Sequence, residues 1–135
     1  AELFDFKTDR IVMAEKTVDV TDYDMFITDF SSFVFDYVCL SRPIMYFVPD
    51  YTQFKAGMGH YKDLDLPFDE AFGPFTTNPE EAASIVASEI ENGFAVSEVY
   101  KERMDSFFLP LDDCGDRLYD YINRHMLPQI RKEQM

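Results

Sequence analysis

The residues best suited to chemistry lie in one short stretch, FITDFSSFVFD, residues 26–36. Five polar residues interrupt its apolar runs: Thr28, Asp29, Ser31, Ser32 and Asp36. Serine hydroxyls and the free N–H groups of a helix start can bind a phosphate without a lysine or an arginine. Asp36, on the same helix face as Ser32 one turn further along, can accept a hydrogen bond from a ligand hydroxyl. The stretch is therefore a candidate site for a phosphate ester.

The same residues also have a purely structural interpretation. Asp29, Ser31 or Ser32 can cap the following helix, because these residue types are common at helix starts. We expect Asp36 to be buried, where an unpaired charge is costly, so it can pair with Arg42 or with a backbone amide instead of a ligand. The local pattern leaves both interpretations open.

The segments around this stretch predict a parallel α/β unit. Residues 24–28 and 44–48 are apolar on both faces, as buried parallel strands are, and residues 31–40 have the all-round apolar wheel of a buried helix. Pro43 ends that helix, since the residue before a proline is pushed out of the α region. Strand, helix and strand form a βαβ unit with a right-handed crossover. Ligands bind beyond the carboxyl ends of such strands, which is where residues 28–32 lie.

Other segments predict a few more elements. Asn78 as N-cap, Pro79 at the first helical position and Asn92-Gly93 at the end are strong signals for a helix between them. Asp112 or Asp113 is expected to cap the last helix. The remaining expectations are short strands over 10–14 and 73–77, a long loop over 51–71 with one helical turn at its start, helices over 97–107 and 113–124, and a frayed tail over 125–135.

Composition limits the classes of function. The chain has 135 residues, of which 47% are hydrophobic, enough for one core, so we expect a single α/β domain over 1–135. A net charge of -14 disfavours a nucleic-acid partner and argues against membrane association through this acidic domain. Cys39 and Cys114 lack the spacing of a disulfide framework or zinc site, so a reducing compartment fits best and we assign no metal and no cofactor. The opening residues suggest a fragment of a longer protein.

Residues from about 10 to 122 resemble the carboxyl-terminal domain of the CDP-glycerol glycerophosphotransferases, the teichoic-acid polymerases and primases. The similar segments are DMFITDFSSFVFDYVCLSRPIMYF, Asp50, GPF, NPEEAASIV and YKERMDSFFLPLDDCGDRLYDYI. The resemblance implies a Rossmann-like parallel sheet flanked by helices, the C-terminal half of a glycosyltransferase-B-type architecture. In the family this half holds the CDP-alcohol donor, and the contacts carry over to Ser31, Ser32 and Asp36.

The resemblance also implies a reaction. A hydroxyl of a lipid-linked acceptor attacks the β-phosphorus of CDP-glycerol and CMP is released. The histidines that the family assigns to this chemistry belong to an upstream half, so we expect no catalytic residue in this chain and no activity of the chain by itself. The parent protein would be cytoplasmic, peripheral at the inner face of a bacterial cell membrane, and would meet its acceptor through that upstream half.

Several single residues have weaker interpretations. His60 and Met58 stand where the family often has an aromatic residue and an arginine, and we interpret His60 as packing in its loop. We interpret His125 as a cation near the C-terminal end of a helix. Arg117 can reach a phosphate or pair with Asp113. Cys39 is interpreted as a small core residue, and residues 62–70 as a solvated acidic loop.

Two other functions fit the same sequence. One is a non-catalytic α/β interaction module, in which the serines only cap a helix and the acidic surface binds a protein. The other is a related transferase that uses another nucleotide-activated alcohol or sugar, because a diphosphate motif does not identify the group beyond it.

Overall fold

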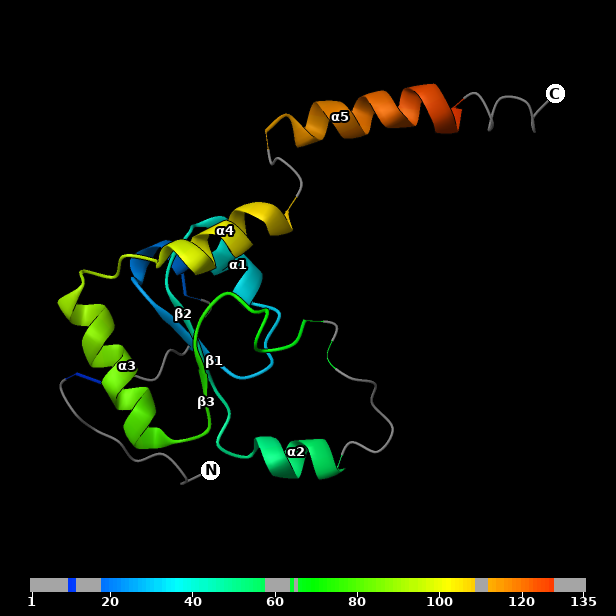
Figure 1. Ribbon diagram of the computed structural model, residues 1–135. Coiled ribbons are helices and arrows are strands. Elements are labelled where there is room, and N and C mark those ends of the chain that lie inside the picture. Colours follow the sequence, from blue (N-terminus) through cyan, green and yellow to red (C-terminus); the bar gives the residue numbers. More distant parts are fainter. Residues whose placement is uncertain (1–9, 12–17, 58–63, 65, 109–111, 128–135) are drawn as a thin grey trace.

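The computed structural model describes residues 10, 11, 18–57, 64, 66–108 and 112–127 (Figure 1). At its centre is a three-stranded parallel sheet in the order β1-β2-β3. The strands are β1 (Phe26–Thr28), β2 (Ile44–Phe47) and β3 (Phe75–Thr76). The register places Thr28 opposite Tyr46, and Tyr46 opposite Phe75. The predicted α/β fold with a parallel sheet is confirmed.

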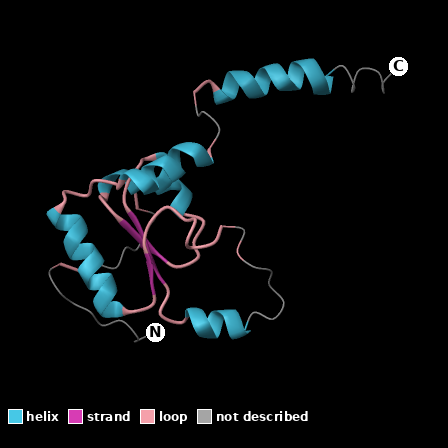
Figure 2. Cartoon of the chain, in the orientation of Figure 1, coloured by secondary structure: helices cyan, strands magenta, loops and turns pink. Residues whose placement is uncertain are grey.

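Helices lie around the strands, and the last helix projects away from the sheet (Figure 2). They are the 3-10 helix Val20–Asp22, α1 (Val34–Cys39), α2 (Tyr51–Gly57), α3 (Pro79–Glu91), α4 (Glu98–Phe107), α5 (Cys114–Tyr121) and the π-helical turn Ile122–Met126 that continues α5. None of the helices in the described part of the chain is long and apolar enough to cross a membrane.

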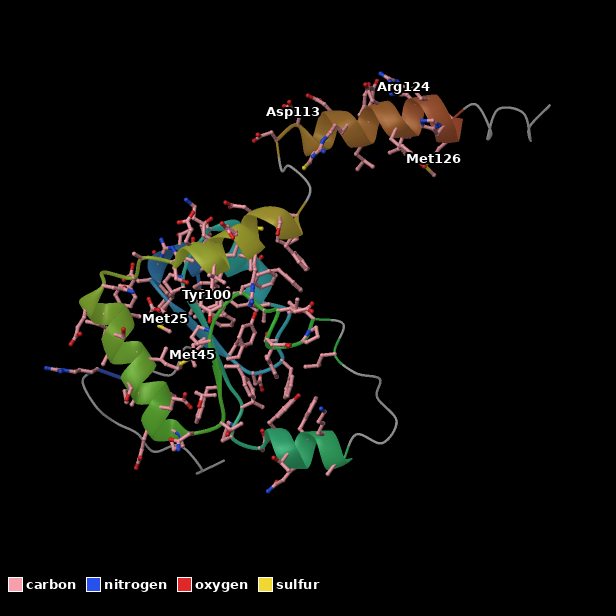
Figure 3. All side chains as sticks on the ribbon, viewed as in Figure 1. Met25, Met45, Tyr100, Asp113, Arg124 and Met126 are labelled. Atoms are coloured by element: carbon pink, nitrogen blue, oxygen red, sulfur yellow. The ribbon has the colours of Figure 1, made fainter. Side chains whose placement is uncertain are left out.

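One buried cluster joins the sheet to α1 and α4. It contains Val34, Tyr37, Val38, Ile44, Tyr46, Ala71, Phe72 and Met104. Successive residues of a strand point to opposite faces, so Met45 lies on the other face of β2, where it is also buried (Figure 3). The middle strand is therefore covered on both sides, as predicted for a parallel sheet.

β1 is less buried than the sequence predicts. Ile27, in the middle of β1, is 48% exposed, so the expectation that β1 is buried on both faces is wrong. β1 is an edge strand of the described sheet, and the face that carries Ile27 is only partly covered. Of the strand predicted over 10–14, only Arg10 and Ile11 lie within the described residues, and Ile11 occupies a single β-bridge.

Helix α1 is half-buried, and the prediction of an all-round buried helix is wrong. Val34, Tyr37 and Val38 face the core, whereas Asp36 and Cys39 are exposed. Cys39 is therefore not the core residue that the sequence suggested. An all-round apolar wheel cannot reveal which side a short helix turns to its neighbours.

Arg42, which follows α1, ties this helix to the segment before β1. Its guanidinium donates to the carbonyl oxygens of Tyr23 and Thr21, the latter at 3.1 Å, and lies 3.8 Å from a carboxylate oxygen of Asp24. The suggested pairing of Arg42 with Asp36 is thus replaced by backbone contacts. These contacts fix where the chain enters β1.

The helices after the sheet follow their end signals. The Asn78 side chain accepts from the amides of Glu80 and Glu81 at 2.8 and 3.2 Å, Pro79 is the first residue of α3, and Gly93 has a φ of 69°. Helix α4 starts after Ser97, as expected. Helix α2 has seven residues and exceeds the single turn predicted.

The last helix starts where the sequence predicts, but its cap and its end differ from the prediction. Asp113 occupies the N-cap position of α5 with a left-handed φ of 56°, and its side chain makes no capping hydrogen bond. Helical structure continues through Met126, so His125 belongs to a helical turn and not to a frayed tail, with its ring 4.7 Å from that of Tyr121. Residues 128–135 of the predicted tail lie outside the described residues. Figure 3 shows Asp113, Arg124 and Met126 well away from the body that contains Met45.

Gly73 gives a first testable prediction. A Cβ at this position would lie 1.8 Å from the backbone oxygen of Ile44, in the middle strand of the sheet. A sheet carbonyl cannot swing aside as a flexible side chain can, so Gly73→Ala should destabilise the protein by about 3 kcal/mol in urea unfolding. Gly115→Ala is the matched control, because no atom lies within 4 Å of the added carbon. Equal unfolding midpoints for wild type and Gly73→Ala would contradict the close approach.

Ser41 gives a second prediction. It follows α1 with a left-handed φ of 50°. In this conformation a residue with a side chain is destabilised by steric strain, whereas glycine is not. Ser41→Gly should therefore raise the free energy of unfolding by about 1 kcal/mol. Ser41→Ala, which keeps the Cβ, should give no such gain. A loss of stability in the glycine variant would show that the conformation is not strained.

Candidate functional site

A pocket of about 200 Å³ opens at the end of the sheet where β1 leads into α1. Asp29, Phe30, Ser31 and Ser32 line it from the connecting loop, and Val34 and Phe35 from α1. The other walls are Tyr46 of β2 and Leu64, Leu66, Phe68 and Ala71 of the segment before β3. This is the rim at which parallel α/β sheets bind their ligands.

The structure brings together three of the five predicted site residues. Asp29, Ser31 and Ser32 line the pocket. Thr28 ends β1 just below it and is buried opposite Tyr46, without lining the pocket. Asp36 also lies outside the lining and is exposed, so the expectation of a buried carboxylate is wrong.

The start of α1 is not the row of free amides that the sequence suggests. The amides of Val34, Phe35 and Asp36 each donate over 3.2 Å to the carbonyl oxygens of Ser31, Ser32 and Phe33, respectively. The Ser31 hydroxyl accepts from the amide of Phe33 at 3.3 Å. Ser31 therefore has the structural role of the capping interpretation, although the N-cap residue itself is Phe33 and has no side-chain cap.

Fewer donors remain for a ligand. In the described part of the chain, neither the Ser32 hydroxyl nor the amides of Ser31 and Ser32 have a hydrogen-bond partner. Asp29 uses one carboxylate oxygen to accept from the amide of Phe30 at 2.6 Å, which fixes the carboxylate at the pocket rim. The described lining contains no lysine or arginine. An anion would thus be held by neutral donors, as the acidic composition requires.

Aromatic rings form much of the pocket wall. Phe30, the aromatic residue between Asp29 and Ser31, stacks on Phe54 of α2 with ring centroids 3.8 Å apart. Phe68 stacks on Phe75 of β3 at 4.4 Å, and its centroid is 5.3 Å from that of Tyr46. Contacts between rings in these arrangements add to the free energy gained by burial. The ring contacts connect the loop to α2 and the sheet, and they give the pocket a firm apolar interior.

Tyr46 is the most unusual of the lining residues. Its side chain is only 5% exposed, and its hydroxyl is buried with no hydrogen-bond partner among the described residues. Burial raises the pKa of Tyr46 to about 12; the nearby backbone of Phe72 limits the rise without completing a hydrogen bond of normal geometry. The hydroxyl is therefore protonated at neutral pH and can both donate and accept.

The remaining candidates do not join the site. His60 and Met58 lie outside the described residues. The Arg117 guanidinium donates to Cys114 Sγ at 3.2 Å on α5, a helix that Figure 1 shows apart from the sheet. Sequence reasoning missed Tyr46 and the walls at Leu66 and Phe68, since nothing in an aperiodic segment indicates that it folds over a strand end.

Comparison with known proteins identifies a family for the chain. Residues 4–123 match the family model described as CDP-Glycerol:Poly(glycerophosphate) glycerophosphotransferase. No solved structure matches the chain significantly.

Two curated relatives are each named "Teichoic acid poly(glycerol phosphate) polymerase". The protein from Staphylococcus epidermidis is 34% identical over 104 residues, which cover 67% of this chain and 13% of the relative. The protein from Bacillus subtilis (strain 168) is 38% identical over 64 residues, covering 47% of this chain and 8% of the relative. The chain thus corresponds to a small part of each relative. Because the family model extends over most of the chain and includes the pocket loop, the chain belongs to the CDP-glycerol:poly(glycerophosphate) glycerophosphotransferase family.

Proposed function

We propose that this chain is a donor-binding domain, the second half of a glycosyltransferase-B-type glycerophosphotransferase. The whole enzyme would transfer glycerol phosphate from CDP-glycerol to a lipid-linked acceptor in the synthesis of a teichoic-acid-like polymer. The observation that carries the proposal is the convergence of Asp29, Ser31 and Ser32 on one pocket at the carboxyl rim of a parallel sheet. The family match supports the choice of donor.

The exposed rim of the pocket suits the diphosphate of the donor. The Ser32 hydroxyl and the amides of Ser31 and Ser32 offer neutral hydrogen-bond donors, which suit phosphate oxygens. The carboxylate of Asp29 would repel a phosphate placed beside it. It is better suited to accept a hydrogen bond from a hydroxyl of the donor. Asp36, exposed on α1, is available to whatever part of the donor extends beyond the pocket.

The reaction balances as a displacement at phosphorus. An acceptor oxygen forms a bond to the β-phosphorus of CDP-glycerol, the bond from that phosphorus to the bridging oxygen breaks, and CMP leaves with the bridging oxygen. The acceptor proton goes to a base supplied by the other half of the enzyme. Negative charge spreads over the phosphoryl oxygens during the step, and donors fixed at the rim stabilise it.

The net charge bears on the direct partners of this domain. At -14, the charge disfavours anionic lipid headgroups and nucleic acid as direct partners. From the family match, and not from the charge, we propose that the parent protein is cytoplasmic and peripheral at the inner face of the membrane, with the membrane and the lipid-linked acceptor bound by other parts of the enzyme.

Calorimetric titration with CDP-glycerol tests the proposal. Ser32→Ala removes a hydroxyl that has no partner in the described structure, so it should leave the melting temperature unchanged and weaken binding about tenfold, the loss of one hydrogen bond to a charged group. Ser84→Ala is the control, since Ser84 is exposed on α3 and bonds only within its helix. Equal affinities of wild type and Ser32→Ala for CDP-glycerol would show that the motif is not part of the donor site.

Ser31→Ala should behave differently. Its hydroxyl accepts from the Phe33 amide, so this variant should lose about 1 kcal/mol of unfolding free energy as well as affinity. Urea unfolding measures the first effect and calorimetry the second. Full stability in Ser31→Ala would show that the Ser31 hydroxyl does not hold the turn.

A further inference from the structure

We propose that Phe54 of α2 is a positioning residue for the donor site: its ring stacks on Phe30 and thereby sets the direction of the hydrogen-bonding groups in the loop of residues 29–32, the serine loop. The inference rests on the proposed function. It adds to that function a residue that does not line the pocket and acts through its contact with this loop.

The serine loop has few contacts that hold it in place. Its hydrogen bonds stay within residues 29–35: Asp29 accepts from the amide of Phe30, and Ser31 and Ser32 accept from the start of α1. In the described part of the chain, none of its hydrogen bonds reaches β2, β3 or α2. Asp29, Ser31 and Ser32 are exposed, whereas Phe30 is partly buried. Besides its covalent links to β1 and α1, the position of the loop therefore depends on the packing of Phe30.

Phe54 makes the closest ring contact of Phe30. Their ring centroids are 3.8 Å apart and their planes are inclined by 14°, whereas the Phe30 and Phe68 centroids are 5.8 Å apart at a tilt of 42°. A face-to-face contact of this kind is lost when either ring turns or moves aside. Phe54 therefore restricts the orientation of the Phe30 side chain.

Helix α2 can provide this support because the sheet anchors its first turn. The Tyr51 amide donates to the carbonyl oxygen of Val48, directly after β2, at 3.1 Å. The Phe54 amide donates to the carbonyl oxygen of Asp50 at 2.8 Å. The Tyr51 ring also lies edge-on to Phe75 of β3, with centroids 5.2 Å apart. Phe54 thus has a fixed place relative to the strands.

The backbone transmits the orientation of Phe30 to the groups that would bind a phosphate. The Ser31 amide belongs to the planar peptide unit between Phe30 and Ser31, so a rotation of the Phe30 backbone turns this N–H. Ser32, with its free amide and hydroxyl, follows one residue later. Hydrogen bonds weaken steeply when the donor points away from the acceptor. A serine loop that loses the stack should therefore bind a diphosphate more weakly.

The stack is separate from the hydrophobic core. Neither Phe30 nor Phe54 belongs to the core cluster or to the described side chains that pack against it. Phe107 of α4 offers a contrast. Its ring stacks on Phe35, which lines the pocket from α1, with centroids 5.5 Å apart, and lies edge-to-face at 4.9 Å from the buried Phe72. Loss of the Phe107 ring should affect the core, whereas loss of the Phe54 ring should affect the serine loop.

Calorimetric titration of the 135-residue chain with CDP-glycerol tests the inference. Phe54→Leu keeps an apolar side chain but removes the ring, and it should weaken binding about tenfold, as the loss of one hydrogen bond to a charged group would. Phe54→Tyr keeps the ring and should bind like wild type. Phe107→Leu is the matched control, because it makes the same change at a ring stacked on a different pocket residue. It should lose more stability in urea unfolding than Phe54→Leu and still bind like wild type.

A double-mutant cycle with Ser32→Ala separates positioning from a general loss of stability. If Phe54 acts through the serine loop, Ser32→Ala should weaken binding about tenfold in wild type but less than about threefold in the Phe54→Leu background, because the hydroxyl is already displaced there. Independent effects would multiply instead.

Wild-type affinity in Phe54→Leu, or multiplied losses in the cycle, overturns the inference. A loss in Phe54→Tyr as large as in Phe54→Leu also overturns it, because the tyrosine variant keeps the ring. If Phe54→Leu does not fold, Phe54→Met, which also lacks a ring, takes its place in both measurements. If Ser32→Ala weakens CDP-glycerol binding and Phe54→Leu does not, the proposed function stands without this inference. If wild type does not bind CDP-glycerol, both proposals fail.

Discussion

The parallel pairing of β1 with β2 is the constraint on which the rest of the structure depends. Its register sets Thr28 beside Tyr46, so the loop that follows Thr28 begins at the same rim as the Tyr46 ring. A shift of one residue would turn Tyr46 to the other face of the sheet and Met45 toward the pocket. The close approach of Gly73 to Ile44 and the contacts of Arg42 with the chain before β1 both act on this pairing, one from each side. Features far from any ligand thereby determine the shape of the site.

The core and the site share the same aromatic side chains. Phe68 stacks on Phe75 and contacts Tyr46, and all three belong to the hydrophobic core or pack against it. When the walls of a pocket are also core side chains, the shape of the pocket is maintained by the close packing of the core and not by a flexible loop alone.

Sequence reasoning succeeds here where the determining signal is local. Asn78, Pro79 and Gly93 fix the ends of α3 by capping and backbone conformation, and the apolar run 44–48 identifies the middle strand. The motif Asp29, Ser31 and Ser32 is likewise local, and its place at the strand end follows from the βαβ order. The failures concern neighbours distant in sequence. The exposure of Asp36, Cys39 and Ile27 depends on which surfaces other elements cover, and the wall at Phe68 comes from a segment without periodicity.

Electrostatics explains why such a domain would need a second half. The described lining holds no cation, while the chain as a whole carries a net charge of -14. In the proposed donor site, a diphosphate at the rim would thus gain little from long-range attraction, and its binding would depend on short hydrogen bonds. Under that proposal, contacts that are equally strong before and during the reaction hold the donor without lowering the barrier, and only their strengthening as charge develops at phosphorus speeds the step. The base that takes the acceptor proton would come from the other half of the enzyme. If the proposed function is right, such a donor half would hold CDP-glycerol without cleaving it until the acceptor and the base of the other half are in place.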